Sequence, residues 1–407
     1  MPDQPAEARP RVVLGVAGGI AAYKACELLR RLTESGHRVR VVPTAAALTF
    51  VGEATWAALS GQPVSADVWT GAHEVPHVRL GREADLLVVA PATADILAKA
   101  AHGLADDLLT NTLLTARCPV LFAPAMHTEM WEHPATQANV ATLRARGAVV
   151  LEPAVGRLTG ADTGKGRLPE PAEIFAVAVR LLRRGAGESD LAGRHVVVTA
   201  GGTREPIDPV RFIGNRSSGK QGYAIARAAV ARGARVTLIA ANVTLPDPAG
   251  ADVVRVETTE QLRVAALAAA KGADAVIMAA APADFRPAHL SETKIKKVDG
   301  TAPVLELVTN PDIAAELGAG KPEGQVLVAF AAETADLERA VVAGHEKLLR
   351  KRADLIVVNE VGVNKTFGAE RNQAVILGAD GSRDPLPDLP KDELADRILD
   401  RVAACFA

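Results

Sequence analysis

The chain has 407 residues and a formal net charge of −2, and its residues are 48% hydrophobic but only 3% aromatic. This length predicts two or three domains, each large enough for its own core. The near-neutral charge excludes a general basic surface for nucleic acid, so any anion must be bound by a local cluster of cations.

The cysteines and the N-terminal segment exclude further classes of protein. Cys26, Cys118 and Cys405 show neither CxxC nor metal-ligand spacing, so we expect neither a disulfide framework nor a zinc site. Residues 1–10 are polar and proline-rich, unlike a signal peptide, and no apolar run approaches 18 residues. We therefore expect a cytoplasmic protein that does not interact with a membrane.

The first elements predict a nucleotide-binding α/β unit. An apolar strand at 11–16 leads through the glycine turn 17–20 into a helix at 21–34, and a second strand follows at 39–42. A nicotinamide dinucleotide site would have Asp or Glu after that strand for the ribose hydroxyls, whereas this chain has Pro-Thr-Ala. We therefore expect flavin mononucleotide (FMN) rather than NAD, with its phosphate near Gly18, Gly19 and Thr44.

Two further buried strands are predicted at 85–90 and 119–123, and each ends in a proline-containing polar segment. Open parallel sheets bind ligands at the carboxyl ends of their strands, so both exits should face one crevice. The second exit carries Met126, Met130 and Trp131, which core packing would explain equally well.

Motifs in this half resemble the flavoprotein cysteine decarboxylase family over about residues 11–180. They are G-G-I-A-A-Y-K at 18–24, A-P-A-T-A-D at 90–95 and P-A-M-x-x-x-M-W at 124–131. A lone histidine is more often structural, but His77 fits the family pattern H-x-x-L-x-x-x-A-D-L, which implies a catalytic imidazole that orients or deprotonates a cysteinyl substrate. The implied FMN contacts are Gly18, Gly19, Ile20, Thr44, Pro91, Ala92 and Thr93, and the implied substrate contacts are Met126 and His127.

The implied decarboxylation has no net redox change. Flavin would oxidise the cysteine side chain to a thioaldehyde, which accepts the electrons released with CO₂, and the flavin would then return its electrons. Two positions depart from the family. His127 replaces an Asn that binds the substrate carboxylate, although an imidazole can also bind that group. Gly160 replaces a clamp-loop Cys, so the final proton donor is open.

A linker is predicted after the helix at 173–184, because Gly, Ser and acidic residues follow without apolar periodicity. We therefore expect domains at 1–187 and 188–407.

The second domain begins with a strand at 195–200, a long connection at 201–222 and a helix at 223–232. The connection carries four cations among glycines and serines, which predicts an anion site before a helix N-terminus. It contains G-x-x-x-x-G-K, but Gln221 stands where a P-loop needs Ser or Thr, so we reject a P-loop ATPase. The string T-R-E-P-I-D-P-V-R-F-I-x-N-x-S-S-G-K-x-G resembles the phosphopantothenate–cysteine ligase signature.

Later strands at 235–240, 275–280 and 326–330 alternate with helices and predict a second doubly wound sheet. Lys347 and Lys351 share one helix face, which is unfavourable unless an anionic group lies between them. The nucleotide contacts implied by the resemblance are Met278, Ala279, Ala280, Asp284, Lys294, Pro311, Asp312, Ile313, Phe330, Lys347 and Lys351.

The implied ligation has two steps. The carboxylate of 4′-phosphopantothenate attacks the α-phosphate of CTP and releases pyrophosphate, and the cysteine amine then displaces CMP from the acyl-cytidylate. The resemblance makes Lys294 and Asn215 catalytic and Arg211 a substrate contact. Mg²⁺ would accompany the triphosphate, although no residues are identified as its ligands.

The order of the two halves matches the bacterial bifunctional coenzyme A biosynthesis family after residue 10. That family implies a homo-oligomer, a dodecamer built from decarboxylase trimers and ligase dimers, with small-molecule substrates and no nucleic acid. A nicotinamide oxidoreductase is disfavoured, because acids are missing after both second strands. A flavin-holding protein without activity is the other alternative, favoured by Gly160 and His127 but opposed by His77.

Overall fold

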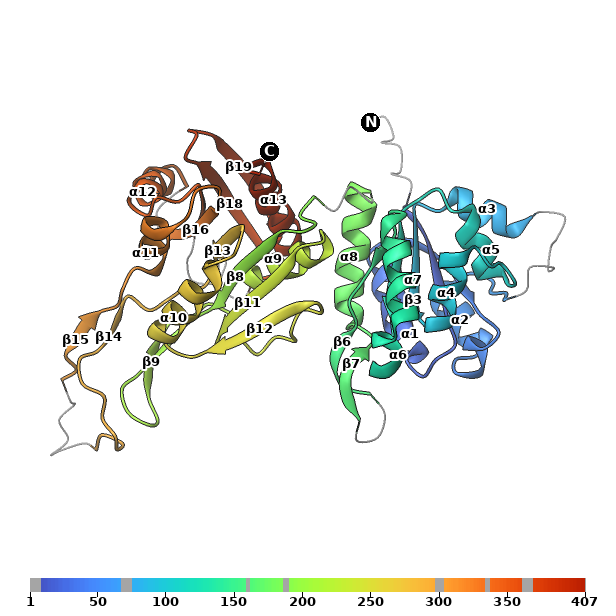
Figure 1. Cartoon of the computed structure of the whole chain (residues 1–407), viewed down its shortest axis with the longest axis horizontal. Helices are drawn as coiled ribbons and strands as arrows, with labels where there is room; N and C mark the ends of the chain where they lie inside the picture. Colours follow the sequence, from blue (N-terminus) through green and yellow to red (C-terminus); the bar gives the residue numbers. More distant parts are fainter. Residues whose placement is uncertain are drawn as a thin grey trace, which may run out of the picture. The chain divides into compact units, whose positions relative to one another are not determined.

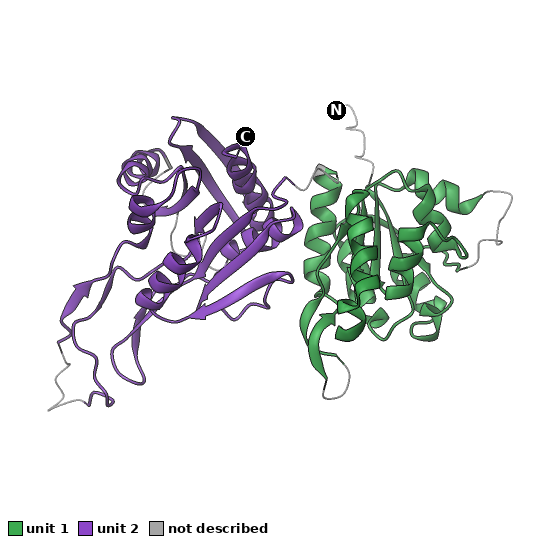
Figure 2. Cartoon of the chain, viewed as in Figure 1, with its two compact units in different colours: residues 1–188 green, residues 189–407 purple. Residues whose placement is uncertain are grey.

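The computed structural model describes residues 9–66, 75–158, 162–185, 190–296, 304–333, 337–360 and 369–406. Contacts divide the chain into two compact units, residues 1–188 and 189–407, which Figure 2 shows in separate colours. Each unit is built around its own sheet (Figure 1). In these ranges, no helix has both the length and the apolar composition needed to cross a bilayer.

Unit 1 contains a parallel sheet with the order β2-β1-β3-β4-β5. Its strands are β1 (Arg11–Val16), β2 (Arg38–Pro43), β3 (Leu86–Ala92), β4 (Val120–Pro124) and β5 (Val149–Val150). Its helices are α1 (Ala22–Glu34), η1 (Ala47–Thr49), α2 (Glu53–Ser60), α3 (Pro76–Glu83), α4 (Ala94–His102), α5 (Leu108–Thr115), α6 (Thr128–Glu132), α7 (Pro134–Ala145) and α8 (Pro171–Arg184). The antiparallel hairpin of β6 (Ala154–Arg157) and β7 (Thr163–Arg167) follows β5.

Helices cover both faces of this sheet, so its strands read as continuous apolar runs. Val13 of β1 packs in one cluster with Ile96 of α4, Leu109 of α5 and Val140 of α7. Helices α1 and α8 pack against each other and contact the strands. The strand order reverses between β1 and β3, which directs a ligand to the crevice beyond their carboxyl ends.

Unit 2 contains an eight-stranded sheet with the order β12-β11-β8-β13-β16-β17-β18-β19. Its strands are β8 (His195–Gly201), β11 (Arg235–Ala241), β12 (Ala251–Val256), β13 (Ala275–Met278), β16 (Val326–Glu333), β17 (Leu355–Glu360), β18 (Arg371–Gly378) and β19 (Arg383–Pro390). Two hairpins pair β9 (Arg204–Pro206) with β10 (Phe212–Gly214) and β14 (Phe285–Pro287) with β15 (Leu307–Thr309). Its helices are α9 (Lys220–Ala231), α10 (Thr259–Ala270), α11 (Ile313–Gly320), α12 (Leu337–Arg350) and α13 (Lys391–Ala404).

Alternating residues of β8 face the two apolar layers of unit 2. Val196 and Val198 pack with α9 and α13, whereas Val197 packs with the side chains of α10, α11 and α12. The strand order reverses between β8 and β13, and the bridge between Gly202 and Ala281 continues that pairing past the strand ends. The ligand crevice of this sheet is therefore expected beyond β8 and β13.

The predicted α/β class with two doubly wound sheets is confirmed, with three differences in detail. Strand β18 is antiparallel to both of its neighbours, β17 and β19, in a region for which no strand was predicted. The 201–222 connection contains the hairpin β9–β10, whose three-residue strands are too short to show periodicity. Helix α9 begins at Lys220 rather than Tyr223, so the end of the signature is helical.

Candidate active sites

Unit 1 has a cavity of about 400 Å³ at the carboxyl end of its sheet. The turn after β1, the exits of β3 and β4 and the hairpin β6–β7 contribute its walls. Its lining residues are Gly18, Gly19, Ile20, Ala21, Tyr23, Lys24, Pro91, Thr93, Ala94, Ala125, Met126, His127, Met130, Arg157, Leu158, Gly166, Arg167 and Leu168.

Two glycines allow the backbone segments around this cavity to approach closely. A Cβ added to Gly18 would lie 2.4 Å from Cβ of Ala46, and one added to Gly166 would lie 2.2 Å from the carbonyl oxygen of Met126. The N–H of Met126 also donates to the carbonyl of Gly166 over 2.9 Å, which ties the β4 exit to β7. The cavity wall is therefore fixed by main-chain contacts that other residues would disrupt.

Most of the predicted FMN and substrate contacts line this cavity, but two do not. Thr44 follows β2 at the same edge of the sheet, and its hydroxyl accepts a hydrogen bond from the N–H of Ala47 over 3.2 Å. Ala92 is fully buried as the last residue of β3, while its neighbours Pro91 and Thr93 reach the cavity. The side chain of Thr93 caps α4 by accepting from the N–H of Ile96.

His77 lies in the first turn of α3 and is absent from the lining of the described cavity. Its carbonyl accepts a hydrogen bond from Thr115 of α5 over 2.8 Å. Its Nδ1 is buried and has no hydrogen-bond partner within the described ranges. A buried ring nitrogen without a partner is unfavourable for folding alone, so this position is a functional candidate.

Two arginines and a lysine that were not predicted as contacts also line the cavity. Arg167 and Lys24 both form ion pairs with Glu170, over 2.5 Å and 3.3 Å. Arg157 enters from the other strand of the hairpin. Only the motif around Lys24 was used in the sequence analysis, and the position of the arginines depends on the pairing of β6 with β7.

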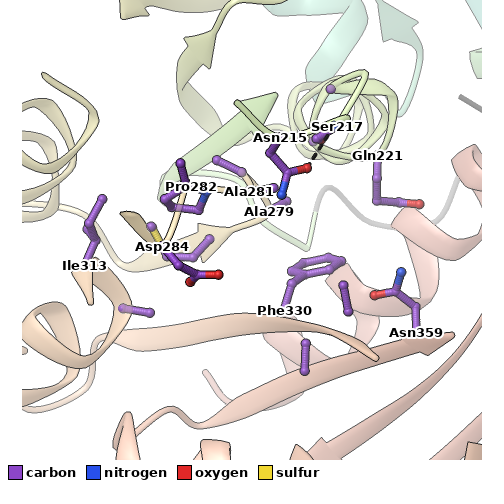
Figure 3. A pocket seen from close by; sticks show the side chains of 18 of the residues that line it. Asn215, Ser217, Gln221, Ala279, Ala281, Pro282, Asp284, Ile313, Phe330 and Asn359 are labelled. Atoms are coloured by element: carbon purple, nitrogen blue, oxygen red, sulfur yellow. Dashed lines mark hydrogen bonds between the residues drawn. The ribbon is translucent and has the colours of Figure 1, made fainter. Parts of the chain in front are cut away.

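Unit 2 has a cavity of about 420 Å³ at the predicted crevice. It is lined by the α9 N-terminus, the β13 exit, the segment before α11 and parts of β16, β17, β18, α12 and α13. Asn215 and ten of the predicted nucleotide contacts line it: Met278, Ala279, Ala280, Asp284, Pro311, Asp312, Ile313, Phe330, Lys347 and Lys351. In Figure 3, Asp284 and Phe330 lie on one side of the cavity and Asn215 on another.

Two buried threonines hold the β13 exit in place. The hydroxyl of Thr199 accepts from the N–H of Ala280 over 3.0 Å, and that of Thr203 accepts from the N–H of Ala283 over 2.8 Å. Asn215 Oδ1 accepts from the N–H of Ser217 over 3.0 Å, a bond drawn in Figure 3. The threonines were not predicted to have a role, because their partners lie about eighty residues away in sequence.

Lys347 and Lys351 are neutralised by carboxylates of the protein. Lys347 donates to Glu333 over 2.5 Å, and Lys351 donates to both oxygens of Asp312 over 2.5 and 2.6 Å. Burial raises the pKa of Asp312, but hydrogen bonds from Lys351 and from the N–H of Ala315 outweigh it and hold that pKa below its usual value. The like-charge cost expected for this lysine pair is thus already offset without a triphosphate.

Lys294 and Arg211 do not line the described cavity. Arg211 donates to the carboxylate of Asp208 and to the carbonyl of Ile295, and the N–H of Ile295 donates back to Asp208. Hydrogen bonds from Arg211 are the largest cause of a pKa for Asp208 well below its usual value. This network fastens the segment next to Lys294, whose own side chain is exposed.

A polar corner of the unit 2 cavity was missed by the sequence analysis. Gln221, Asn359, Asn372 and Lys391 line it from α9, β17, β18 and α13. No local motif marks the last three residues, since only the fold brings these elements together.

The described residues include neither a metal-ligand cluster nor the clamp-loop position. No cluster of three or more His, Cys, Asp or Glu side chains suited to a metal occurs in the described parts of the chain. Gly160, the position of the family's clamp-loop Cys, lies outside the described residues.

Two family models match the chain. Residues 3–183 match "Flavoprotein", and residues 191–406 match "DNA/pantothenate metabolism flavoprotein C-terminal domain".

Relatives match over nearly the full length. The coenzyme A biosynthesis bifunctional protein CoaBC of Mycolicibacterium smegmatis is 58% identical over 405 residues, covering 98% of both chains. The protein of that name from Bacillus subtilis is 44% identical over 397 residues, covering 97% of this chain and 96% of its own.

Solved structures match single halves. The C-terminal domain of a coenzyme A biosynthesis bifunctional protein CoaBC has 36% identity and a TM-score of 0.45, covering 53% of this chain and 97% of its own. The FMN-dependent cysteine decarboxylase SpaF has 36% identity and a TM-score of 0.38, covering 44% and 99%.

Proposed function

The chain belongs to the family of bifunctional coenzyme A biosynthesis proteins, and we propose that unit 2 joins 4′-phosphopantothenate to cysteine with CTP while unit 1 decarboxylates the product with FMN. The enzyme thus has a ligase half and a flavoprotein decarboxylase half. The product of the ligase is the substrate of the decarboxylase, which gives a chemical reason for joining the two halves.

One observation supports the ligase assignment most strongly. Ten of the predicted nucleotide contacts and Asn215 line a single cavity, at the place where the strand order of the sheet reverses. In the proposed reaction the carboxylate of 4′-phosphopantothenate forms a bond to the α-phosphorus of CTP, and pyrophosphate leaves with the electrons of the broken bond. Asn215 then holds the acyl carbonyl while the cysteine amine displaces CMP. Lys294 and Arg211 support the first step from the segment that Asp208 fastens.

The residues around the unit 1 cavity fit FMN. The wall at Gly18 and Gly166 is closed by backbone contacts, and the cavity combines apolar side chains with the cations Lys24, Arg157 and Arg167. Gly18, Gly19 and Thr93 would hold the cofactor, with Ile20 and Pro91 against its apolar surface. When bound, FMN supplies a reversible two-electron acceptor for the cysteinyl side chain.

Three groups of this chain would act on the substrate in unit 1. Met126 and His127 would contact it at the β4 exit, where an imidazole can bind the carboxylate. His77 would accept or hold a proton at Nδ1, its buried and unpartnered nitrogen among the described atoms. His77 does not line the described cavity of its own chain. The proposal therefore requires either a substrate that extends from the cavity to His77 or a second copy of the chain that supplies this histidine.

Mg²⁺ would arrive on the triphosphate, and one feature of unit 2 supports the proposed oligomer. Exposed apolar side chains occur on the hairpin β14–β15 and on the described parts of the connection between its strands, where Leu290 is 61% and Val304 96% exposed. Such a surface suits the proposed ligase dimer, and decarboxylase trimers would complete a dodecamer.

A coupled assay tests the proposed function. The purified chain, loaded with FMN, is given 4′-phosphopantothenate, cysteine, CTP and Mg²⁺, and pyrophosphate and CO₂ are measured. We expect one pyrophosphate for each ligation and CO₂ only when FMN is bound. A protein that stays colourless after reconstitution and fails to join cysteine to the acid with any nucleoside triphosphate would refute the proposal.

A further inference from the structure

Glu205 is a buried carboxylate in the ligase signature of unit 2. It lies in β9 and is only 3% exposed. Its Oε1 atom accepts two hydrogen bonds from the first residue of α10, from the N–H of Thr259 over 2.9 Å and from its hydroxyl over 2.7 Å. In the described ranges Glu205 forms no ion pair with a cation. A helix N-terminus only partly offsets the cost of burying a charge, so Glu205 is unfavourable for folding alone and is a functional candidate.

Two buried threonines connect this carboxylate to the β13 exit. Thr259 and Thr203 are both fully buried, and their hydroxyl oxygens lie 2.9 Å apart. An ionised carboxylate can only accept, so Thr259 donates its single hydroxyl hydrogen to Glu205. Thr203 therefore donates to Thr259, and its own oxygen accepts from the N–H of Ala283 over 2.8 Å. The charge of Glu205 thus sets one direction for the whole chain of hydrogen bonds, and such chains strengthen cooperatively.

Asn310 joins the same network from the segment before α11. Its side-chain nitrogen donates to the hydroxyl of Thr259 over 3.3 Å and to the carbonyl of Ala283 over 2.8 Å, and its side-chain oxygen accepts from Arg286 over 2.9 Å. Its backbone N–H donates to the carbonyl of Asp284 over 2.8 Å. Asn310 and Asp284 both line the cavity, so these bonds hold two of its wall segments together.

The network also reaches Asn215 through the main chain. The carbonyl of Thr203 accepts from the N–H of Asn215 over 3.4 Å. A Cβ added to Gly202 would lie 2.8 Å from the carbonyl oxygen of Asn215, so this close approach of the two segments requires glycine. Thr203 therefore links the segment of Asn215 to the β13 exit, which carries Asp284 on another side of the cavity (Figure 3).

We propose that Glu205 is a positioning residue of the ligase, which acts through Thr259 and Thr203 to fix Asn215 relative to the segments that contact the nucleotide. This inference rests on the ligase function proposed above. The acyl-cytidylate formed in the first step has to stay in place while the cysteine amine attacks it, so one rigid frame serves both steps. A misplacement of about 1 Å can slow such a reaction about 10²-fold. Glu205 does not line the described cavity, so it acts through its partners and not on the substrate.

Calorimetric titration of the full chain with CTP alone tests this network without requiring turnover. Thr259→Val keeps the shape of the side chain but breaks the chain of hydrogen bonds, and we expect CTP to bind about tenfold more weakly. Thr259→Ser keeps the hydroxyl and should restore the affinity to within about twofold of the wild type.

Thr258→Ala is the matched control for a purely structural effect. Thr258 is the N-cap of the same helix, and its hydroxyl accepts from the N–H of Gln261 over 3.2 Å. Loss of this cap should lower the melting temperature of unit 2 but leave CTP affinity unchanged, because Thr258 is outside the Glu205 network. If Thr259 only stabilised α10, Thr258→Ala and Thr259→Val would instead behave alike.

Glu205→Gln tests the charge that directs the chain, and it also serves if Thr259→Val folds poorly. We expect kcat/KM for CTP to fall about ten- to a hundredfold. The KM for 4′-phosphopantothenate should stay within about twofold, because Arg211 is held by the separate carboxylate of Asp208. The double variant Glu205→Gln/Thr203→Val should be no weaker than the weaker single variant, since both changes break one chain.

Unchanged CTP affinity in Glu205→Gln and Thr259→Val would overturn the proposal, as would losses that multiply in the double variant. Equal losses of CTP affinity in Thr258→Ala and Thr259→Val would also overturn it. Failure of the ligase function itself would be seen separately, as wild-type protein that binds neither CTP nor ATP, and this inference would fall with it.

Discussion

The cavities of the two units lie at equivalent places, beyond β1 and β3 in one sheet and beyond β8 and β13 in the other, but their walls are held differently. In unit 1, backbone contacts at Gly18 and Gly166 leave no room for a side chain. In unit 2, lysines are held by carboxylates at distances of 2.5–2.6 Å, as for Lys347 and Lys351.

This difference suits the proposed ligands. A wall fixed by the main chain keeps one shape, which favours a cofactor that remains bound through many turnovers. A wall of ion pairs can exchange its carboxylates for phosphate oxygens, which favours a charged substrate that arrives whole and leaves in two parts. The comparison predicts that shape changes impair unit 1 and that charge changes impair unit 2.

The largest expected effect concerns His77. We expect His77→Asn to lower the decarboxylation rate by about 10²- to 10⁴-fold, because a group positioned for proton transfer is removed. Ligation by the same chain should stay within about twofold and serves as an internal control for folding. Carbon dioxide release is the measurement, and His102→Asn, at an exposed position near the end of α4, is the matched control. Wild-type rates of CO₂ release in His77→Asn would remove the catalytic assignment.

Lys294→Gln should have the next largest effect, on unit 2. Loss of a cation that stabilises charge on the phosphoryl group should slow pyrophosphate release by about 10²- to 10³-fold. Lys296→Gln changes a neighbouring exposed lysine and should leave the rate nearly unchanged. Equal losses in the two variants would mean that the general charge of this segment matters, rather than Lys294.

Much of this fold could be predicted because its signals are local. Buried parallel strands are continuous apolar runs, and ligands bind where such strands end, so Pro91 and Asp284 could be assigned to cavities without a structure. His77 was selected by a motif, but whether it reaches a cavity depends on the packing of α3 against α5.

The remaining site features depend on pairing between distant segments. Asn359 and Lys391 line one cavity with Gln221 because α13 packs against both α9 and β17, and no periodicity in the sequence indicates those contacts. Likewise, the lysine pair at 347 and 351 predicted an anion, but it could not reveal that Glu333 and Asp312 already supply one. Ion-pair partners 14 and 39 residues away are set by tertiary structure.

A smaller effect is expected when the shape of unit 1 is changed. In Gly166→Ala the new Cβ would lie 2.2 Å from the carbonyl oxygen of Met126, so the backbone must shift at the cavity wall. Overpacking of this kind costs about 1–3 kcal/mol. If the FMN-bound protein bears this cost, FMN affinity falls by about 5- to 150-fold. Flavin fluorescence titration measures the Kd. Gly52→Ala, where a Cβ would meet nothing within 4 Å, should bind FMN normally.

The smallest expected effect tests the exchange of ion pairs in unit 2. Glu333→Gln removes the carboxylate that holds Lys347, so the lysine no longer has to leave a partner before it binds a phosphate. Because partly exposed ion pairs contribute about 0.2–1 kcal/mol, the KM for CTP should fall by about 1.4- to 5-fold. Glu316→Gln breaks a similar ion pair, between Glu316 and Arg263, and neither residue lines the described cavity. This variant should leave the KM for CTP unchanged. A higher KM for CTP in Glu333→Gln would mean that this carboxylate contributes to CTP binding. Lys347 would then not exchange its carboxylate partner for a phosphate, and the proposed difference between the two cavity walls would be wrong at this residue.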